Sequence, residues 1–398
     1  MAHELSKPGE PGDTNRREAP GAEAPTNGAE QGITFHAPES VPDEEPYHGL
    51  RWIFIGGEGL RAGWSALLAL FLFLFFFLPI STAIMVRLQL FDGNLDKLEP
   101  VSAFFLEAAS LIALIGSVAL VGVIEQRRLV DYNLAGTHRP RHFLIGLSAG
   151  FLGISSLVAG LHAGGWLHLA QGELAGLAIA RYALMWGGVF LLTGCYEEGS
   201  FRCYLQFTLS RGISFWWALG TIAAVCAGLA AFVGGSASRG VYAAALLGLV
   251  ACIILRMRSA SHDGNQFWYA AWVTSTLFGA IHIANSGESG IGILATACIG
   301  LVFCISLRVT GSAWWAIGCH AGWDWGETFF YGAADSGQSP HGSLFESGPL
   351  GNPFWSGGSV GPEGSVLVLG AILLLLALLL VYGWWAAPAR PDSAIGSR

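Results

Sequence analysis

The sequence is poor in charge. Only 12% of its 398 residues are Asp, Glu, Lys or Arg, while 53% are hydrophobic. Soluble globular domains carry about 25% charged residues, so this composition excludes an ordinary soluble domain and indicates a polytopic membrane protein whose main partner is the lipid bilayer. A basic stripe of the kind that binds nucleic acid is also missing, so we expect no nucleic-acid partner.

Cysteine pairs with metal-ligand spacing are missing as well. The seven cysteines all fall in apolar segments, none with CxxC spacing, and we interpret them as free thiols that serve as small packing residues. The N-terminus lacks the basic-then-apolar order of a secretory signal. We therefore expect the first membrane helix to direct insertion.

The formal net charge of −8 belongs mainly to one end of the chain. The first 45 residues hold ten acids and three basic residues, and residues 1–48 are rich in Pro, Glu, Gly and Ala. Such a segment cannot bury enough apolar surface to offset the entropy of ordering. We expect a disordered acidic cytoplasmic tail over 1–48, a transmembrane domain over 49–388 and a short cytoplasmic tail over 389–398.

Hydropathy predicts an all-α fold, a transmembrane helix bundle of about ten spans, each near the ~20 residues that a bilayer needs. The predicted spans are 63–86, 102–124, 143–163, 177–209, 214–234, 241–257, 267–285, 290–307, 312–332 and 365–386. With the N-terminus inside, twelve arginines fall on the inner side and only Arg87, Lys97 and Arg239 on the outer side. This asymmetry predicts cytoplasmic termini and puts the long 332–364 connection on the outer face.

Three charged residues interrupt the fourth predicted span: Glu197, Glu198 and Arg202. An ionisable group at bilayer depth costs at least ~2.5–3.5 kcal/mol, so three within six residues indicate a function. In a helix Arg202 lies on the same face as Glu198, its i−4 neighbour, and can neutralise it. Glu197 is then left without an in-helix partner, as a general base in a low-dielectric site would be.

Two further polar pairs lie in predicted spans at helical spacing, Phe278-x-x-x-His282 and His320-x-x-x-Asp324. Isolated polar groups in lipid are penalised, so we expect the helices that carry Glu197, His282 and His320 to meet around one cavity. From the predicted depths of these residues, we expect that cavity in the inner half of the membrane, open to the cytoplasm.

In this order on successive apolar segments, the three motifs resemble those of the CPBP intramembrane proteases, which include type II CaaX prenyl endopeptidases and bacterial Abi proteins. The resemblance covers roughly residues 177–332, the motif-bearing core of a protease domain over 49–388. Two departures concern residue types, since Cys203 stands where glycine is common and Asp324 where Asn is more frequent. A third is the 75 residues between Arg202 and Phe278, explained by the spans 214–234 and 241–257 as an inserted pair added to a core of about eight.

The resemblance implies an intramembrane endopeptidase that hydrolyses a peptide bond of a membrane-associated or lipidated substrate. In that family's terms Glu197 activates the attacking water, and His282 assists as a second base or ligand. His320 with Asp324 stabilises the oxyanion or orients its donor. The supporting residues are Glu198, Arg202 and Phe278.

A metal mechanism stays open at this point, because Glu197, His282 and His320 would also form a two-His, one-carboxylate set for a divalent metal such as zinc. We favour a metal-free mechanism, since no His-x-x-x-His or Glu-x-x-His pair on one helix preorganises such a site.

Other classes of membrane protein are alternatives to a CPBP-like protease. A rhomboid-like serine protease needs a GxSxG motif, and the chain has two matches, 146–150 and 357–361, but 55 glycines make such matches common. A transporter or channel that uses the intramembrane acids and histidines as a proton or ion relay is the main alternative, and a catalytically silent scaffold is a third. Glu327 could join the polar cluster or be exposed, and we interpret Glu107 as a helix-end or interfacial residue.

Overall fold

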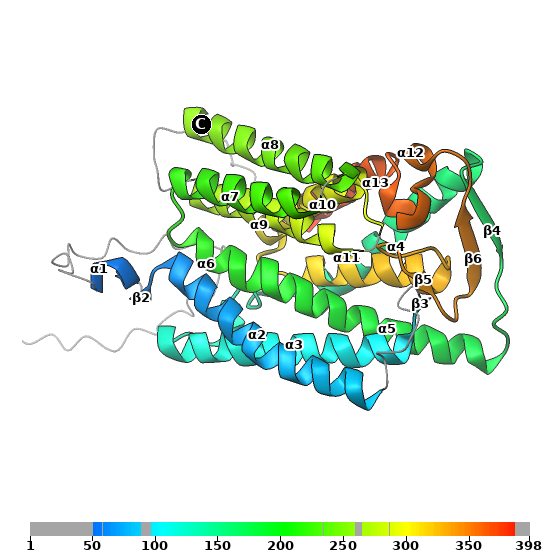
Figure 1. Ribbon diagram of the computed structural model, residues 1–398, viewed down its shortest axis with the longest axis horizontal. Coiled ribbons are helices and arrows are strands. Elements are labelled where there is room, and N and C mark those ends of the chain that lie inside the picture. The colour runs from blue at the N-terminus through cyan, green and yellow to red at the C-terminus, as the bar shows by residue number, and fades with distance from the viewer. Residues whose placement is uncertain are drawn as a thin grey trace, which may run out of the picture. The chain divides into compact units, whose positions relative to one another are not determined.

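The computed structural model describes residues 51–57, 59–88, 97–233, 235–258, 265–285 and 287–386 (Figure 1). The tails predicted over 1–48 and 389–398 lie outside these ranges. The α-helices are α1 (Arg51–Phe54), α2 (Ala62–Arg87), α3 (Pro100–Glu125), α4 (Arg139–Ala163), α5 (Leu177–Glu198), α6 (Gln206–Ser210), α7 (Phe215–Val233), α8 (Gly235–Arg258), α9 (Gln266–Ile281), α10 (Gly290–Thr310), α11 (Trp314–Trp325), α12 (Pro353–Ser356) and α13 (Val368–Ala386).

Shorter elements complete the chain. The 3-10 helices are η2 (Leu129–Asp131), η4 (His282–Ala284), η6 (Gly358–Val360) and η7 (Pro362–Gly364), and the π-helices are η3 (Gly199–Leu205) and η5 (Gly326–Phe330). The strands are β1 (Ile55–Gly56), β2 (Gly59–Leu60), β3 (Lys97–Leu98), β4 (Leu167–Gln171), β5 (Ser339–Pro340) and β6 (Phe345–Pro349). They form three two-stranded pairs, β1–β2 and β4–β6 antiparallel and β3–β5 parallel.

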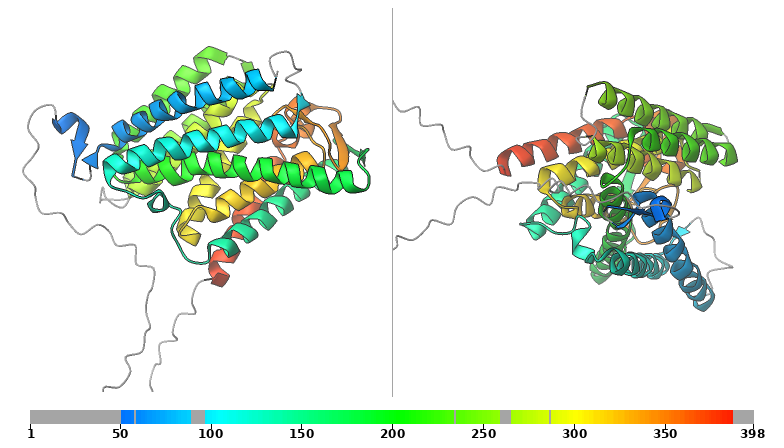
Figure 2. Two further views of the ribbon diagram at one scale, coloured as in Figure 1. Left: turned by 90° about the horizontal axis from the view of Figure 1, so that it is seen from below. Right: turned by 90° about the vertical axis from the view of Figure 1, so that its left-hand side faces the viewer.

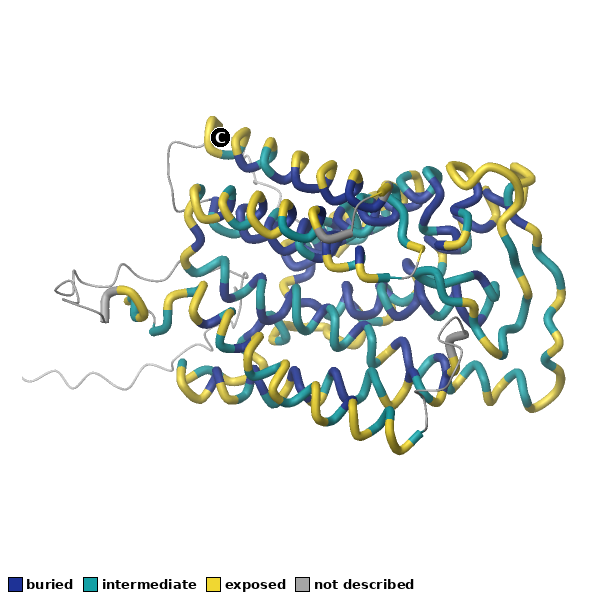
Figure 3. Tube along the Cα trace, in the orientation of Figure 1, coloured by how far each residue is buried: buried dark blue, intermediate teal, exposed yellow. Residues whose placement is uncertain are grey.

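The predicted all-α membrane bundle is confirmed, and a helix lies over each of the ten predicted spans. Among the described residues seven helical stretches are long and apolar enough to cross a membrane: Ala62–Arg87, Pro100–Glu125, Arg139–Ala163, Leu177–Ser210, Ala237–Arg258, Gly290–Thr310 and Val368–Ala386. Figure 3 shows exposed residues, in yellow, along the outward faces of α2, α7 and α8. Many of these are large and apolar, such as Phe71, Trp216 and Leu246, as lipid contact requires.

The two ends of the bundle differ. We call the end at which α2 begins the terminal end. Helix α13 also ends there (Figure 2). Near its end, a Cβ at Gly383 would meet Val309, which lies near the end of α10. The opposite end, the loop end, holds the 332–364 connection with β5, β6 and α12 (Figure 1). That connection is an ordered part of the fold, because β6 pairs with β4 over five residues.

Glycines bring α4 and α11 into backbone contact. A Cβ at Gly146 or Gly150 of α4 would overlap the carbonyl of Trp315 or Cys319, and one at Gly318 or Gly322 of α11 would overlap carbonyls of α4. Two small-xxx-small motifs therefore face each other. The 146–150 GxSxG match is part of this packing surface, and His320 lies between the two glycines of α11.

The predicted inserted pair, α7 and α8, packs against α9. Residues such as Ile222 of α7, Val241 of α8 and Val273 of α9 share one buried cluster. A separate cluster joins α4, α11 and α13 through Ile154, Cys319 and Leu375, among others. The pair therefore supports the helix that leads into His282, while α4 supports the helix that carries His320.

Candidate active site

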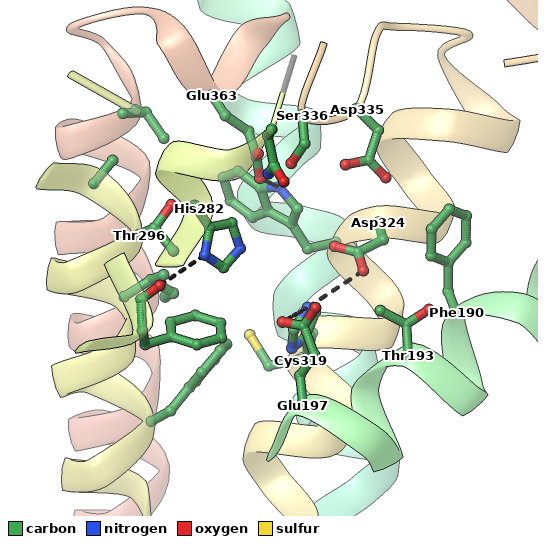
Figure 4. A pocket seen from close by; sticks show the side chains of 18 of the residues that line it. Phe190, Thr193, Glu197, His282, Thr296, Cys319, Asp324, Asp335, Ser336 and Glu363 are labelled. Atoms are coloured by element: carbon green, nitrogen blue, oxygen red, sulfur yellow. Dashed lines mark hydrogen bonds and ion pairs between the residues drawn. The ribbon is translucent and has the colours of Figure 1, made fainter. Parts of the chain in front are cut away.

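One cavity of about 310 Å³ collects the polar motifs (Figure 4). The sequence-predicted residues that line it are Glu197, Phe278, His282, His320 and Asp324. They come from α5, α9, η4 and α11, so the predicted convergence of these helices is observed. Glu198 and Arg202 do not line the cavity and are fully buried beside it.

The buried pair of Glu198 and Arg202 forms as helical spacing predicts. Arg202 Nε lies 3.2 Å from Glu198 Oε2, and Arg202 Nη1 donates to Glu198 Oε1 at 3.3 Å. The guanidinium also lies 4.1 Å from the ring centroid of Phe278, a cation–π contact. Phe278 therefore lies against the ion pair and also lines the cavity.

The backbone around Arg202 is adapted to hold this pair. The glutamates end α5, and the chain continues as the π-helix η3; such bulges are frequent at functional sites. Asn133 Nδ2 donates to the Arg202 carbonyl at 2.8 Å. A Cβ at Gly300 would lie 2.6 Å from Arg202 Nη2, so the lack of a side chain on α10 leaves space for the guanidinium.

Glu197 has the surroundings expected of a carboxylate that can reach a water. Its side chain is 25% exposed, whereas that of Glu198 is fully buried. Its Oε2 lies 3.8 Å from His320 Nε2, and no Lys or Arg ion pair to it occurs among the described residues. The neighbouring glutamates therefore have different partners, as predicted.

His320 is held by carboxylates on two helices. Its Nδ1 lies 2.9 Å from Glu198 Oε1, and its Nε2 lies 3.4 Å from Asp324 Oδ2. Since a carboxylate only accepts, we assign the Nδ1 proton to the bond with Glu198. This contact between α5 and α11 was not predicted. It directs Nε2 into the cavity, toward Glu197 and Asp324.

His282 is held in the opposite wall of the cavity. Its Nδ1 lies 2.7 Å from the carbonyl oxygen of Phe278, one helical turn earlier. The carbonyl can only accept, so Nδ1 carries the proton and Nε2 keeps a lone pair. The imidazole also packs edge-on against the Phe278 ring, with centroids 4.9 Å apart. His282 can therefore accept a proton from a water in the cavity.

The prediction that the cavity opens toward the terminal end of the bundle is wrong. Figure 4 shows Asp335, Ser336 and Glu363, from the 332–364 connection, lying beyond Asp324 and His282 on the side away from Glu197. The cavity therefore borders the loop end, not the end with the chain termini. Glu197 lies thirteen residues, about 20 Å, before the end of the continuous α5–η3–α6 helix, farther from the terminal end than we expected.

Sequence reasoning missed three carboxylates of the cavity wall: Glu107 of α3, Asp335 and Glu363 of η7. Glu107 was interpreted as a helix-end or interfacial residue, yet its Oε2 is buried without a hydrogen-bond partner. An acid inside an apolar span is the signal that identified Glu197, and it applies equally to Glu107. Of the two alternatives for Glu327, joining the polar cluster is the one observed. Its side chain is fully buried and accepts a hydrogen bond from Trp323 Nε1 at 3.0 Å.

The carboxyls of the 332–364 connection share few donors. Trp323 Nε1, bonded to Glu327, also donates to Glu363 Oε1 at 2.8 Å, and Thr328 Oγ1 donates to Asp335 Oδ2 at 3.0 Å. Burial, together with the nearby Asp335, raises the pKa of Glu363 to about 8, and burial likewise raises the pKa of Asp335. These two carboxyls therefore keep their protons to higher pH than free carboxyls do.

A metal site was one option for Glu197, His282 and His320. Among the residues that the structure describes, no three His, Cys, Asp or Glu side chains are arranged to hold a metal ion together. The alternative ligand set is therefore not assembled here, although each imidazole leaves Nε2 facing the cavity. A divalent metal such as zinc stays the untested alternative to the metal-free mechanism that we favour. All seven cysteines are free thiols, as expected.

Comparison with known proteins gives one family. Residues 255–326 match the family described as type II CAAX prenyl endopeptidase Rce1-like. The matched segment begins in the last turn of α8, the second helix of the predicted inserted pair, and contains Phe278, His282, His320 and Asp324. The resemblance to CPBP proteases is thereby confirmed. No curated protein and no solved structure matches the chain.

Proposed function

Since residues 255–326 belong to the type II CAAX prenyl endopeptidase Rce1-like family, we propose that the chain hydrolyses a peptide bond of a membrane-associated or lipidated substrate in the cavity around Glu197. The observation that carries the proposal is the meeting of Glu197 with both imidazoles in one cavity. Glu197 lies outside the family match, so its position supports the function independently of the comparison.

In the first step a water molecule lies between Glu197 and His282 Nε2. Glu197 accepts one of its protons while the oxygen attacks the substrate carbonyl carbon. The carbonyl π electrons move to oxygen, which becomes the oxyanion of a tetrahedral intermediate. Because Nδ1 of His282 is bonded to the Phe278 carbonyl, the lone pair of Nε2 is aimed at the same water.

In the second step His320 acts as an imidazolium, protonated on both ring nitrogens throughout: its Nδ1 proton is held by Glu198, and its Nε2 proton is donated to the oxyanion as a hydrogen bond. Asp324 orients the imidazole through the contact at 3.4 Å. When the intermediate collapses, the C–N bond breaks and the proton on Glu197 passes to the leaving amine. Glu197 returns to a carboxylate, and each proton is accounted for.

The proposed topology keeps both termini in the cytoplasm, from the Arg asymmetry of the loops. The cavity, which borders the loop end, then faces the outer side of the membrane. The part of the substrate that reaches the cavity would come from that side.

The deciding experiment compares purified wild-type protein with Glu197→Gln in lipid nanodiscs. A series of membrane-anchored peptides is followed by mass spectrometry, with and without a divalent-metal chelator. Cleavage by the wild type that Glu197→Gln lacks supports the proposal, and loss of cleavage on chelation would establish a metal requirement. If no anchored peptide is cleaved but reconstituted vesicles show a proton or ion flux that depends on Glu197, the relay alternative replaces the protease.

A further inference from the structure

Two neutral amide side chains line the cavity, Asn285 and Gln338. Both residues are half-buried, and neither side chain makes a hydrogen bond to another of the described residues. A side-chain amide carries two N–H donors and one acceptor oxygen. The proposed hydrolysis uses neither residue, so this hydrogen-bonding capacity is left for water or for a ligand.

Asn285 is placed by the short helix that begins with His282. η4 is a 3-10 helix, and the Asn285 N–H donates to the His282 carbonyl at 2.9 Å. Side chains three residues apart are eclipsed on a 3-10 helix, so Asn285 lies on the same face as His282. At a rise of ~2.0 Å per residue it is ~6 Å farther along the chain direction. That direction leads to the loop end, where a Cβ at Gly287 would lie 3.2 Å from Ser359 Oγ of η6.

Gln338 is held by a tight turn of the 332–364 connection. The backbones of Asp335 and Gln338 exchange two hydrogen bonds, at 3.0 and 2.9 Å. Between them Ser336 and Gly337 have φ angles of 46° and 84°, and a type I′ turn requires positive φ at both central residues. The Gly337 N–H also donates to the Val360 carbonyl at 3.0 Å, which ties the turn to η6. Gln338 therefore projects from a rigid support.

Both amides lie between the loop end and the reacting groups. Figure 4 shows Ser336, at the tip of this turn, on the side of His282 away from Glu197. Asn285 follows His282 toward the same end. A chain that enters the cavity from the loop end therefore passes the two amides before it reaches Glu197.

Building on the proposed function, we propose that Asn285 and Gln338 form a subsite that binds the main chain of an extended substrate. A peptide group offers one N–H and one carbonyl, and a side-chain amide complements both. The ~6 Å between Asn285 and His282 corresponds to about two residues of extended chain, so the bound peptide group lies about two residues from the scissile bond. In a helix these groups bond to one another, so a segment that stays helical is rejected. At this position the subsite recognises the backbone and not the side chain.

The test replaces the main-chain amides of one membrane-anchored peptide by esters, one at a time on each side of the cleaved bond. An ester keeps the carbonyl and the shape of the chain but lacks the N–H. Each peptide is assayed in phosphatidylcholine nanodiscs with the wild type, Asn285→Ala, Gln338→Ala and the control Gln171→Ala. Gln171 is an exposed amide of β4 outside the cavity. Mass spectrometry identifies the cleaved bond, and binding of labelled peptides is measured in parallel.

We expect one ester, about two residues from the cleaved bond, to lower kcat/KM of the wild type about tenfold, the usual size for one hydrogen bond. Asn285→Ala or Gln338→Ala should lower turnover of the all-amide peptide by a similar factor, and in that variant the ester should cost nothing more. A merely structural role would lower turnover of both peptides equally and leave the cost of the ester unchanged. Gln171→Ala should behave as the wild type. The two amides lie on separate elements, so Gln338→Ala keeps the test decisive if Asn285→Ala does not fold.

This inference and the proposed function fail in different ways. If no peptide is cleaved, the proposed function fails and binding alone decides the subsite: the wild type must bind the all-amide peptide more tightly than one ester peptide, and Asn285→Ala or Gln338→Ala must lose that difference. If peptides are cleaved but no ester lowers kcat/KM, the amides serve water alone and the subsite is overturned while the protease stands. An ester cost that persists in both variants, or that Gln171→Ala also removes, overturns it as well.

Discussion

Adjacent glutamates of one helix have different roles because they face different neighbours. Glu197 reaches the cavity, whereas Glu198 faces Arg202 and His320 in a site closed to solvent. A group that accepts a proton in the reaction needs access to water, and a group that fixes an imidazole needs rigid partners. The exposure of the two side chains therefore decides which carboxylate is the base.

We expect Glu197→Gln to keep its fold and to lose turnover by at least ~100-fold, the usual size of a general-base contribution. The amide is nearly the same size as the carboxylate but cannot accept the proton. Cleavage of an anchored peptide, measured alongside thermal unfolding, checks this. Retained turnover in Glu197→Gln, with loss in a folded Glu198→Gln, would reverse the assignment.

The Glu198–Arg202 pair should contribute to stability as a unit. Glu198→Gln or Arg202→Met leaves one charge buried without its partner, which typically costs ~3–5 kcal/mol. Each single variant should therefore unfold at lower temperature in detergent. The double variant, which removes both charges, should recover much of that loss but not the activity, because His320 loses its Nδ1 partner. Single variants as stable as the wild type would contradict this account.

The stability of the protein should fall as the pH rises toward the pKa of Glu363. The pKa of Glu363 is about 8 in the folded protein, against 4.5 as its ordinary value, because of burial and the nearby Asp335. Between pH 4.5 and pH 8, Glu363 is protonated in the folded state and ionised in the unfolded state. Its contribution to the free energy of unfolding is therefore complete below pH 4.5 and lost above pH 8. Unfolding temperature should decline from about pH 5 to pH 8, and Glu363→Gln should flatten the decline.

Among the elements, α4 and α11 form the most restricted contact of the site. Each of four glycines meets backbone of the other helix, and side-chain movement cannot relieve a clash with backbone. The segment from Gly318 to Gly322 carries His320, so the position of the imidazole depends directly on this contact. A change of a few tenths of an ångström between the helices would move Nε2 relative to Glu197.

Gly150→Ala should therefore be destabilising by about 1–3 kcal/mol or more, as expected for overpacking, and should reduce cleavage. Gly160→Ala on the same helix is the matched control, since a Cβ there meets no atom within 4 Å. It should be neutral or slightly stabilising, because alanine is the better helix former. Thermal unfolding and peptide cleavage of both variants check this, and equal effects at the two positions would refute the role of the glycine contact.

Sequence reasoning predicted the features that depend on local geometry. The Glu198–Arg202 pair follows from spacing within one helix, and the ten spans follow from apolar runs. The Glu198–His320 contact depends on how α5 and α11 are aligned, and Glu107 reaches the cavity through the packing of α3. Neither can be read from spacing along one chain segment. The direction of the cavity was wrong because Glu197 was placed near the inner end of its helix, although the predicted span 177–209 continues for twelve residues beyond it.

At the scale of the whole molecule, the position of the cavity near the loop end makes the orientation in the membrane testable. We expect Ser339→Cys, exposed at the loop end, to react with a membrane-impermeant maleimide from outside intact cells. Thr137→Cys, exposed at the terminal end, should react only after permeabilisation. Neither change alters the Arg distribution that predicts the topology. The opposite labelling pattern would place the cavity opening in the cytoplasm.

The two imidazoles belong to separately packed groups of helices. His282 follows α9, which packs with α7 and α8, while His320 lies on α11, which is locked to α4. α10 contributes Ile293 to the first group and Phe303 to the second. A small shear of one group along α10 would widen the cavity laterally without breaking the α4–α11 contact. Such collective motion takes microseconds to milliseconds, so entry and release of a chain by this route would occur on that timescale. Spin labels on α4 and α8 would report it as a broadened distance distribution.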